Sequence, residues 1–370
     1  ESLKETRLNE QLSEMLEKMS IVMKKKGDNI RSRIYSRALD TVLAEENDIT
    51  DVNQMEGKPH IGPTILSKMN EYTKTGTLSI FESEKDNPLT WLTDIHGIGP
   101  KKAVDLIEKG IRNIDELRER QDDLLNNVQK IGLKYYEDTI KRIPREEINE
   151  YNELFRKEFK KIADKDSQYE IVGSFRRGAK TSGDVDVIIT SKNPEVFKQF
   201  VESLKATGII LEILSCGNTK CLVIAKLKGN AIARRVDFMY SPPDEYPFAV
   251  LYFTGSKAFN TVMRGHSLKM GISLNEHGFY EKEVGEKKGD KLDKNVKTEE
   301  DIFKVLNMKY KTPDERIDGR SVEFINKTIE SQIIDKPNKP KRKYTKKKKV
   351  TEEIKPTTDK PKRKYTKKRK

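Results

Sequence analysis

Two carboxylates lie two residues apart at the start of an apolar run. Asp184 and Asp186 precede residues 187–189, Val-Ile-Ile, which have the composition of a β-strand. Side chains two apart on a strand point to the same face, so both carboxylates would meet there. Carboxylates and phosphate oxygens are the usual ligands of Mg²⁺. The pair therefore predicts a metal site that handles phosphates. The plain alternative for an isolated Asp-x-Asp pair is a solvated strand end.

The segment before this pair is suited to binding a phosphate chain. Gly173-Ser-Phe-Arg-Arg-Gly178 follows a strand-like run at residues 169–172. Glycine lets the backbone approach a ligand closely, and Arg forms paired hydrogen bonds to phosphate oxygens. A strand, a basic glycine turn and a second strand that opens with Asp-x-Asp together predict metal-assisted phosphoryl or nucleotidyl transfer.

A third carboxylate, Asp237, lies further along the chain in Arg234-Arg-Val-Asp-Phe238. Two cations need more than two anionic protein ligands when the substrate phosphates supply the rest, so Asp237 completes the predicted site. Hydrophobic patterns place these residues among further strands and helices. The predicted strands are residues 209–214, 221–226 and 231–240, and the predicted helices are residues 149–163, 194–206 and 298–303.

Two segments near the N-terminus share an Ile-Gly-Pro turn between helical patterns. Residues 57–64 precede a predicted helix at 65–72, and residues 96–102 precede one at 103–107. Helical spacing also covers residues 6–46. Each turn is either a plain corner between two helices or a helix-hairpin-helix, in which backbone N–H groups hold a DNA phosphate without reading sequence. The first is the weaker match because His60 stands where such a turn usually has glycine.

Composition bounds the class of protein. A chain of 370 residues is long enough for two or three domains, and no run approaches the 18 apolar residues of a membrane span. Cys216 and Cys221 have no neighbouring Cys or His cluster, which excludes a zinc site and predicts two free thiols in a reducing interior.

The positive charge is concentrated at the C-terminus. The net charge is +13, but residues 336–370 hold 18 Lys or Arg and 3 Asp or Glu, which leaves residues 1–335 at −2. A basic 11-residue sequence at 339–349 recurs at 360–370. This tail is predicted to be disordered. It is suited to binding phosphate backbones or to serving as a nuclear localisation signal, and simple solvated disorder is the third alternative.

The glycine-arginine turn with Asp-x-Asp, the paired hairpins and the segment Leu251-Tyr-Phe-Thr-Gly-Ser256 resemble DNA polymerase family X. The beta members of that family are the most similar, over roughly residues 8–320, and a viral member is included among the alternatives. The resemblance implies an α+β fold. It implies a helical lyase-like domain with the first hairpin (1–83), a DNA-binding subdomain with the second (84–145), a catalytic palm of antiparallel strands with helices (146–243), a nucleotide-selection subdomain (244–330) and the added basic tail (336–370).

The same resemblance implies a two-metal polymerase site. Asp184, Asp186 and Asp237 would bind two Mg²⁺, with Mn²⁺ able to substitute, and Asp237 would lie nearest the primer. An ordinary strand, turn and helix is the alternative for the segment from residue 251 onward. The residues implied to contact the incoming nucleotide are Ser174, Arg177, Gly183, Tyr252, Phe253, Gly255, Asn260 and Arg264.

The N-terminal part would carry a second chemistry. Lys68 aligns with a lysine that attacks an abasic sugar as a Schiff-base nucleophile, and Arg31 and Tyr35 align with residues that bind the DNA 5′-phosphate. Thr64 replaces a second lysine of that pocket, and the loss of this neighbouring cation would weaken the lyase activity. The hairpins would each hold Na⁺ or K⁺ through backbone carbonyls, at Glu56, Lys58 and Ile61 in the first and at Thr93, Ile95 and Ile98 in the second.

Three positions depart from the beta pattern. Lys257 and Thr261 stand where an acidic and a basic residue lie beside the incoming base, and Met239 replaces an Arg that restrains a catalytic carboxylate in the inactive state. The resemblance therefore leaves base selection open and predicts a less tightly gated site.

Three functions are compatible with the sequence. The first is a templated polymerase that fills short gaps in base excision repair, with 5′-deoxyribose phosphate lyase activity. The second is a template-independent nucleotidyltransferase, which the short connection at residues 227–231 disfavours, and the third is a non-catalytic DNA-binding scaffold. The expected partners are gapped or nicked double-stranded DNA and deoxynucleoside triphosphates, with no membrane and a monomeric state. The expected location is the nucleus, or a cytoplasmic virus factory if the Lys-, Asn- and Ile-rich usage is viral.

Overall fold

The computed structural model describes residues 7–45, 47–84, 87–282 and 289–325. Residues 1–325 form one compact unit and residues 326–370 a second, so the predicted basic tail lies outside the described residues. Within the described ranges, no helix is both long enough and apolar enough to cross a membrane.

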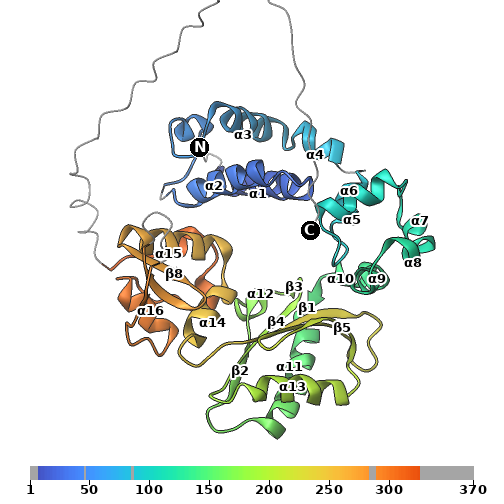
Figure 1. The fold of residues 1–370 in the computed structure, drawn as a ribbon. Coiled ribbons are helices and arrows are strands. Elements are labelled where there is room, and N and C mark those ends of the chain that lie inside the picture. Colours follow the sequence, from blue (N-terminus) through green and yellow to red (C-terminus); the bar gives the residue numbers. More distant parts are fainter. Residues whose placement is uncertain (1–6, 46, 85–86, 283–288, 326–370) are drawn as a thin grey trace, which may run out of the picture. The chain divides into compact units, whose positions relative to one another are not determined.

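The N-terminal part is a helical bundle (Figure 1). Its core is built from apolar side chains at helical spacing, such as Leu12, Met15, Leu16 and Met19, which are all fully buried. This confirms the helices predicted at 6–46 and 65–72. The elements are α1 (Asn9–Lys25), α2 (Asn29–Leu43), the 3₁₀ turn η1 (Val52–Met55), α3 (Pro63–Thr75) and α4 (Ser79–Glu84).

Six short helices with their own apolar core follow. The second Ile-Gly-Pro turn joins α5 to α6, and Pro100 is the first residue of α6, where a missing N–H costs no helical hydrogen bond. These elements are α5 (Pro88–Leu92), α6 (Pro100–Glu108), α7 (Ile114–Glu119), α8 (Gln121–Leu124), α9 (Asn127–Lys134) and α10 (Tyr136–Thr139).

The centre of the chain is a five-stranded sheet in the order β2-β4-β7-β6-β5. All predicted strands and helices of this region are present, and every neighbouring pair is antiparallel except β4 and β7, which are parallel. The elements are β1 (Ile143–Pro144), α11 (Arg145–Ile162), β2 (Gln168–Ile171), α12 (Gly173–Arg176), β3 (Thr181–Ser182), β4 (Val185–Thr190), α13 (Glu195–Ala206), β5 (Ile210–Cys216), β6 (Lys220–Ala225) and β7 (Arg234–Tyr240).

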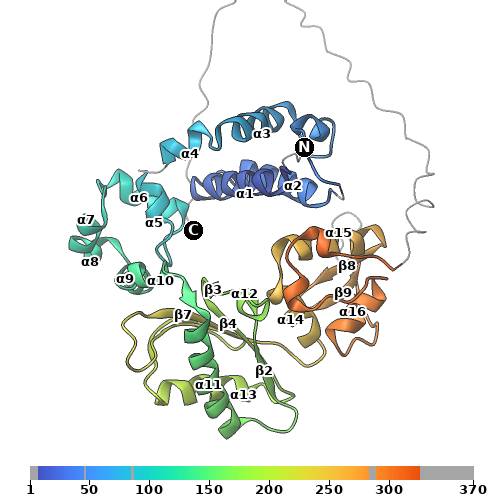
Figure 2. The same cartoon turned by 180° about the vertical axis from the view of Figure 1, so that it is seen from behind.

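One face of this sheet is the hydrophobic core. Val185, Val187 and Ile189 of β4 alternate along the strand and pack with aromatic residues of α11 and α13, such as Phe155 and Phe200. Figures 1 and 2 show both helices on the same side of the sheet. Because strand side chains alternate, the residues between these positions must point to the opposite face.

The remaining described residues form a smaller α+β unit. Residues 251–254 end α14, so the alternative that this segment begins as a strand is wrong. The helix α14 is apolar on all its sides because it is largely buried. The elements are α14 (Tyr246–Thr254), α15 (Lys257–Lys269), β8 (Ile272–Asn275), β9 (Gly278–Glu281), β10 (Lys291–Leu292), α16 (Glu299–Val305), η2 (Pro313–Glu315) and η3 (Gly319–Ser321).

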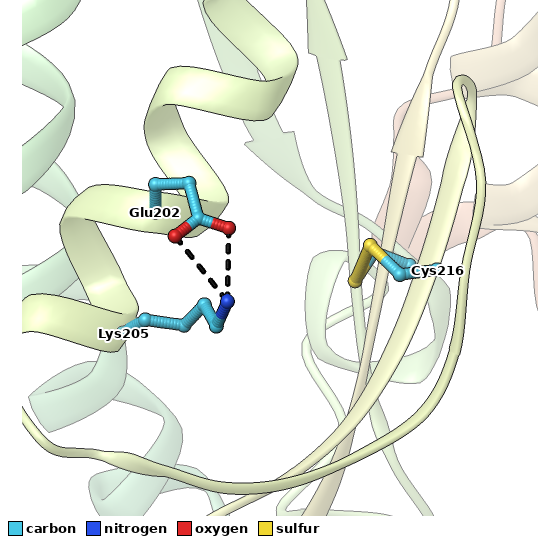
Figure 3. Close-up of a disulfide and its surroundings, with 4 residues drawn as sticks. Glu202, Lys205 and Cys216 are labelled. Atoms are coloured by element: carbon cyan, nitrogen blue, oxygen red, sulfur yellow. Dashed lines mark hydrogen bonds and ion pairs between the residues drawn. A yellow bond between two sulfur atoms is a disulfide. The ribbon is translucent and has the colours of Figure 1, made fainter.

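The two cysteines form a disulfide, which corrects the expectation of free thiols (Figure 3). Cys216 ends β5, Cys221 lies in β6, and the strand register places them directly opposite each other with 4.0 Å between their Cα atoms. Cys221 is fully buried and Cys216 is exposed. Sequence spacing alone does not give a strand register, and the three-residue turn between these strands is what brings the sulfurs together.

Candidate active site

The three predicted metal ligands meet on the face of the sheet away from α11 and α13. Asp186 of β4 and Asp237 of β7 are paired residues of the parallel ladder, and Asp184 comes immediately before β4. The alternating residues Val185 and Val187 hold β4 in this orientation by filling the core on the other face. Asp184 and Asp186 thus lie on one face as predicted, and Asp237 joins them there from the neighbouring strand β7.

The electrostatics of these carboxylates favour a cation. Burial, and then the negative charges of Asp184 and Asp237, raise the pKa of Asp186 to about 7. Burial is also the main cause that raises the pKa of Asp237, whose side chain is only 9% exposed. Partly buried carboxylates that destabilise one another's charge form an oxygen-rich site of the kind that a hard divalent ion prefers.

A cationic side chain already lies among them, and sequence reasoning missed it. The guanidinium of Arg235 donates from Nη2 to Asp184, and its Nε lies 3.2 Å from Oδ1 of Asp237. With the side chains so arranged, no three Asp, Glu, His or Cys residues of the described ranges surround a common point as metal ligands would. The signal was available: Arg235 is two residues before Asp237, so on a strand it shares the same face.

The basic glycine turn lies directly beside the carboxylates. Gly173 has φ of +66°, and a Cβ there would lie 3.1 Å from Oδ2 of Asp186, so only glycine suits the position. The Ser174 hydroxyl donates to Oγ of Ser182 at 2.8 Å. Nη1 of Arg177 donates to the carbonyl of Thr254 at 2.5 Å, and burial lowers the pKa of Arg177. The turn thus gathers a hydroxyl and a guanidinium next to the acidic face.

Arg177 also connects this turn to the second set of predicted nucleotide contacts. A Cβ on Gly255 would lie 3.1 Å from Nη1 of Arg177, so the two predicted groups are adjacent. Nδ2 of Asn260 donates to the carbonyl of Tyr252 at 2.8 Å, and the Arg264 guanidinium lies 5.8 Å from the Tyr252 ring centroid. Tyr252 and Phe253 meet edge to face at 5.2 Å between centroids. Gly183 is exposed beside Nη1 of Arg142.

Comparison with known families matches nearly the whole described chain. Family models match as a helix-hairpin-helix domain at residues 7–78, the fingers domain of DNA polymerase lambda at 90–139, the DNA polymerase beta palm at 142–243 and the DNA polymerase beta thumb at 249–317. The chain belongs to DNA polymerase family X.

Three curated proteins illustrate the similarity. DNA polymerase lambda of Rattus norvegicus is 30% identical over 331 residues, covering 85% of this chain and 57% of that protein. DNA polymerase lambda of Arabidopsis thaliana is 28% identical over 84% of this chain and 62% of its own length, and DNA nucleotidylexotransferase of Xenopus laevis is 28% identical over 77% and 64%. The chain therefore spans about three fifths of the length of these relatives.

Arg176, which the sequence grouped with Arg177, has a structural role. It donates to both carboxylate oxygens of Glu299, at 3.2 and 2.7 Å, and to Oγ1 of Thr254 at 3.0 Å. Arg316, which is fully buried, donates to the same carboxylate of Glu299 at 2.8 Å. This network ties α12 to α16, and neither Glu299 nor Arg316 has a sequence signal that separates it from a surface charge.

Met239 packs in an apolar cluster and makes no polar contact with the carboxylates among the described residues. It belongs to an apolar cluster with Ile188, Ala249 and Val250, where β4 and β7 meet α14. An Arg in this position would bring its charge into that cluster, at the cost of burying it. The β7 cation that contacts the carboxylates is Arg235.

The two hairpin turns have the same local backbone at matching positions. Gly97 has φ of +85° and His60 has φ of +62°, so His60 takes the left-handed conformation that glycine adopts more readily. Inside the turns, the carbonyl of Lys58 accepts from Ile61 N–H at 3.2 Å and that of Ile95 accepts from Ile98 N–H at 3.0 Å. Glu56 and Thr93 are the C-cap residues of η1 and α5.

The predicted lyase residues occupy two helices of the N-terminal bundle. Tyr35 of α2 is buried, which raises its pKa, while the nearby charge of Arg31 opposes that shift. Arg31 is largely exposed, and Lys68 lies partly exposed on α3 five residues after its start. Thr64 is exposed at the beginning of the same helix.

Proposed function

We propose that this chain is a DNA-directed DNA polymerase that fills short gaps during base excision repair. The observation that carries the proposal is the convergence of Asp184, Asp186 and Asp237 beside the glycine-arginine turn that begins at Gly173. Acidic residues that can share cations, next to donors for phosphate oxygens, provide what nucleotidyl transfer needs. Family membership supports the same chemistry.

The proposed mechanism assigns each part of the site one task. Asp184, Asp186 and Asp237 would hold two Mg²⁺, or Mn²⁺ in its place, which when bound would acidify the primer 3′-hydroxyl and neutralise the triphosphate. Asp237, the buried carboxylate of β7, would accept the proton from that hydroxyl. Ser174, Arg177 and Gly183 would bind the β- and γ-phosphate oxygens with neutral and charged donors.

Residues at the end of α14, on α15 and at Gly255 between them would select the nucleotide. Tyr252 and Phe253, fixed edge to face, would crowd a 2′-hydroxyl and so favour deoxynucleotides. Asn260 and Arg264 would face the base and the template, and Gly255 leaves room for the sugar beside Arg177. Lys257 forms an exposed ion pair with Glu17 at 3.0 Å, which would have to open if Lys257 is to contact the base pair.

Gapped or nicked duplex DNA would be held by the hairpin turns. Backbone N–H groups at these turns suit a phosphate, and carbonyls of Thr93, Ile95 and Ile98 would bind Na⁺ or K⁺, as would those of the first turn. We propose a monomer that acts in the nucleus. The relatives reported above come from a rat, a plant and a frog, and they give no support to a cytoplasmic virus factory.

A template-independent transferase is the second candidate because one relative is named DNA nucleotidylexotransferase. The connection between β6 and β7 favours templating. It runs only from Lys226 to Ala233, which leaves little chain to stand in for a template strand.

Gap filling tests the polymerase proposal. A one-nucleotide gap with a 5′-phosphate downstream should be filled by the wild-type chain with Mg²⁺, and Asp237→Ala should lower the rate by at least about a thousandfold. Asp244→Ala is the matched control, because that carboxylate is 71% exposed in the turn before α14 and, among the described residues, forms an ion pair with Lys291 of β10. Filling by Asp237→Ala at the wild-type rate would contradict the assigned role.

We propose 5′-deoxyribose phosphate lyase activity as a second reaction, at Lys68. The amine would attack the sugar C1′ with loss of water to form a Schiff base, and β-elimination would then release the phosphate-bearing DNA end. Borohydride should trap the wild-type chain on incised abasic DNA, and Lys68→Ala should lose most trapping while it keeps gap filling. Equal trapping of both proteins would exclude Lys68 as the nucleophile.

A further inference from the structure

Arg235 belongs to two sites at once. Its guanidinium contacts Asp184 and Asp237. It also lines a cavity of about 510 Å³, together with the second hairpin turn, from Thr93 to Gly99. Leu214 and Ile224 of the central sheet are apolar residues of the same lining.

We propose that Arg235 is a positioning residue that ties Asp184 and Asp237 together while the protein is free of DNA, and that a backbone phosphate entering this cavity draws it away. Its departure releases the two carboxylates for the metal ions. The inference rests on the proposed function, since it assumes that these carboxylates bind metal. It predicts that DNA binding and metal binding strengthen each other.

The geometry supports a competition between Arg235 and a metal ion. A guanidinium and a divalent cation compete for the same carboxylate oxygens, and both cannot occupy the space between Asp184 and Asp237. The Arg235 side chain is 37% exposed, so it has room to turn toward the cavity. Oδ1 of Asp237 and Nε of Arg235 are both buried without a well-aligned hydrogen bond, so the present contact leaves part of their bonding capacity unused.

The cavity is suited to a phosphate. Its lining includes His96 and the turn through Ile98 and Gly99, which leads into the N-terminus of α6. Asp94 also lines it, and its carboxylate is paired with Lys25 at 2.7 Å. The α6 N-terminus adds a partial positive charge, although the turn alone would not specify a site. Arg235 supplies the full charge, and it is the only Arg or Lys among the residues that line this cavity.

A nearby lysine provides a matched control for charge. Lys220 of β6 is exposed, and its positive charge acts on both Asp186 and Asp237. Among the described residues, its ammonium forms no hydrogen bond or ion pair with either carboxylate. Removing Lys220 therefore changes the local charge by the same amount as removing Arg235, but does not free a carboxylate oxygen.

Mn²⁺ binding in the absence of nucleic acid is the test. Free Mn²⁺ is counted by its electron paramagnetic resonance signal during titration of the wild type, Arg235→Gln, Arg235→Lys and Lys220→Gln. Arg235→Gln should bind Mn²⁺ at least about tenfold more tightly than the wild type, while Lys220→Gln should differ by less than about threefold. Arg235→Lys keeps the charge but loses the planar guanidinium, so its affinity for Mn²⁺ should lie between those of Arg235→Gln and Lys220→Gln. If the Gln variant fails to fold, Arg235→Lys is the variant that tests the inference.

The titration is then repeated with gapped duplex DNA, after subtraction of the Mn²⁺ that the DNA binds by itself. DNA should tighten Mn²⁺ binding to the wild type and leave Arg235→Gln nearly unchanged. Equal affinities of wild type and Arg235→Gln without DNA would overturn the inference, as would an equal gain in Lys220→Gln. If none of the proteins binds Mn²⁺, the metal role of the three carboxylates fails, and the inference fails with it.

Discussion

Replacing Asp186 with Asn should stabilise the protein when no metal is present. In the folded state the pKa of Asp186 is raised to about 7 by burial and by its acidic neighbours, against about 3.9 in an unfolded chain. Below the unfolded pKa the carboxyl is protonated in both states and has no pH-dependent effect. As the pH rises from about 4 to about 7, the unfolded state loses its proton first, so the wild type becomes less stable.

The size of the effect follows from that difference in pKa. About 3 units correspond to about 4 kcal/mol above pH 7, and to about 1.5 kcal/mol at pH 5. The negative charges of Asp184 and Asp237 contribute to the raised pKa of Asp186, so about 4 kcal/mol is an upper bound for this one substitution. Asn has nearly the same shape and carries no charge, so its advantage should grow over this pH range.

Urea unfolding in EDTA at pH 5, 6, 7 and 8 measures the difference. The free energy of unfolding of Asp186→Asn should exceed that of the wild type by an amount that increases with pH, and Mg²⁺ should narrow the gap by stabilising only the wild type. Asp166→Asn is the control, because that side chain is 38% exposed and pairs with the exposed Lys192. A difference that does not vary with pH, or a less stable Asn variant at pH 8, would refute the reasoning.

Three further predictions concern stability and are read by chemical unfolding. Replacing both Cys216 and Cys221 with Ser should lower the free energy of unfolding by about 2 kcal/mol, since the disulfide closes a short loop, and dithiothreitol should reproduce the loss only in the wild type. His60→Gly should stabilise the N-terminal bundle by up to about 1 kcal/mol by relieving a positive φ; a loss of stability would mean that the imidazole makes a compensating contact. Glu299→Gln should cost about 3 kcal/mol or more, because fully buried Arg316 loses its charged partner, and a neutral result would show that the aromatic rings around it suffice.

Much of the fold could be read from local pattern. The alternation Val185, Val187, Ile189 predicts which side of β4 is buried and hence where Asp186 points. The same rule applied to β7 places Arg235 on the face of Asp237 and Arg234 on the opposite face. In the structure Arg234 turns to the opposite side and pairs with Glu147 at 2.6 Å.

Features that depend on long-range pairing could not be predicted from the sequence. The Cys216–Cys221 bond requires the register of β5 against β6, which hydrophobic alternation leaves uncertain by a residue or two. The Arg176–Glu299 contact joins residues 123 apart in the chain, and no sequence pattern near either residue predicts it. Local spacing thus finds the carboxylates and the face of Arg235, whereas the disulfide and the Arg176–Glu299 pair emerge only from tertiary packing.

Nucleotide choice tests the central claim most directly. Four gapped duplexes that differ only in the templating base are each offered the four deoxynucleoside triphosphates one at a time, with Mg²⁺. The account predicts that each gap accepts the complementary nucleotide far faster than the other three, and that EDTA or Asp237→Ala abolishes every addition. Additions that ignore the templating base, or that continue without a divalent cation, would contradict it.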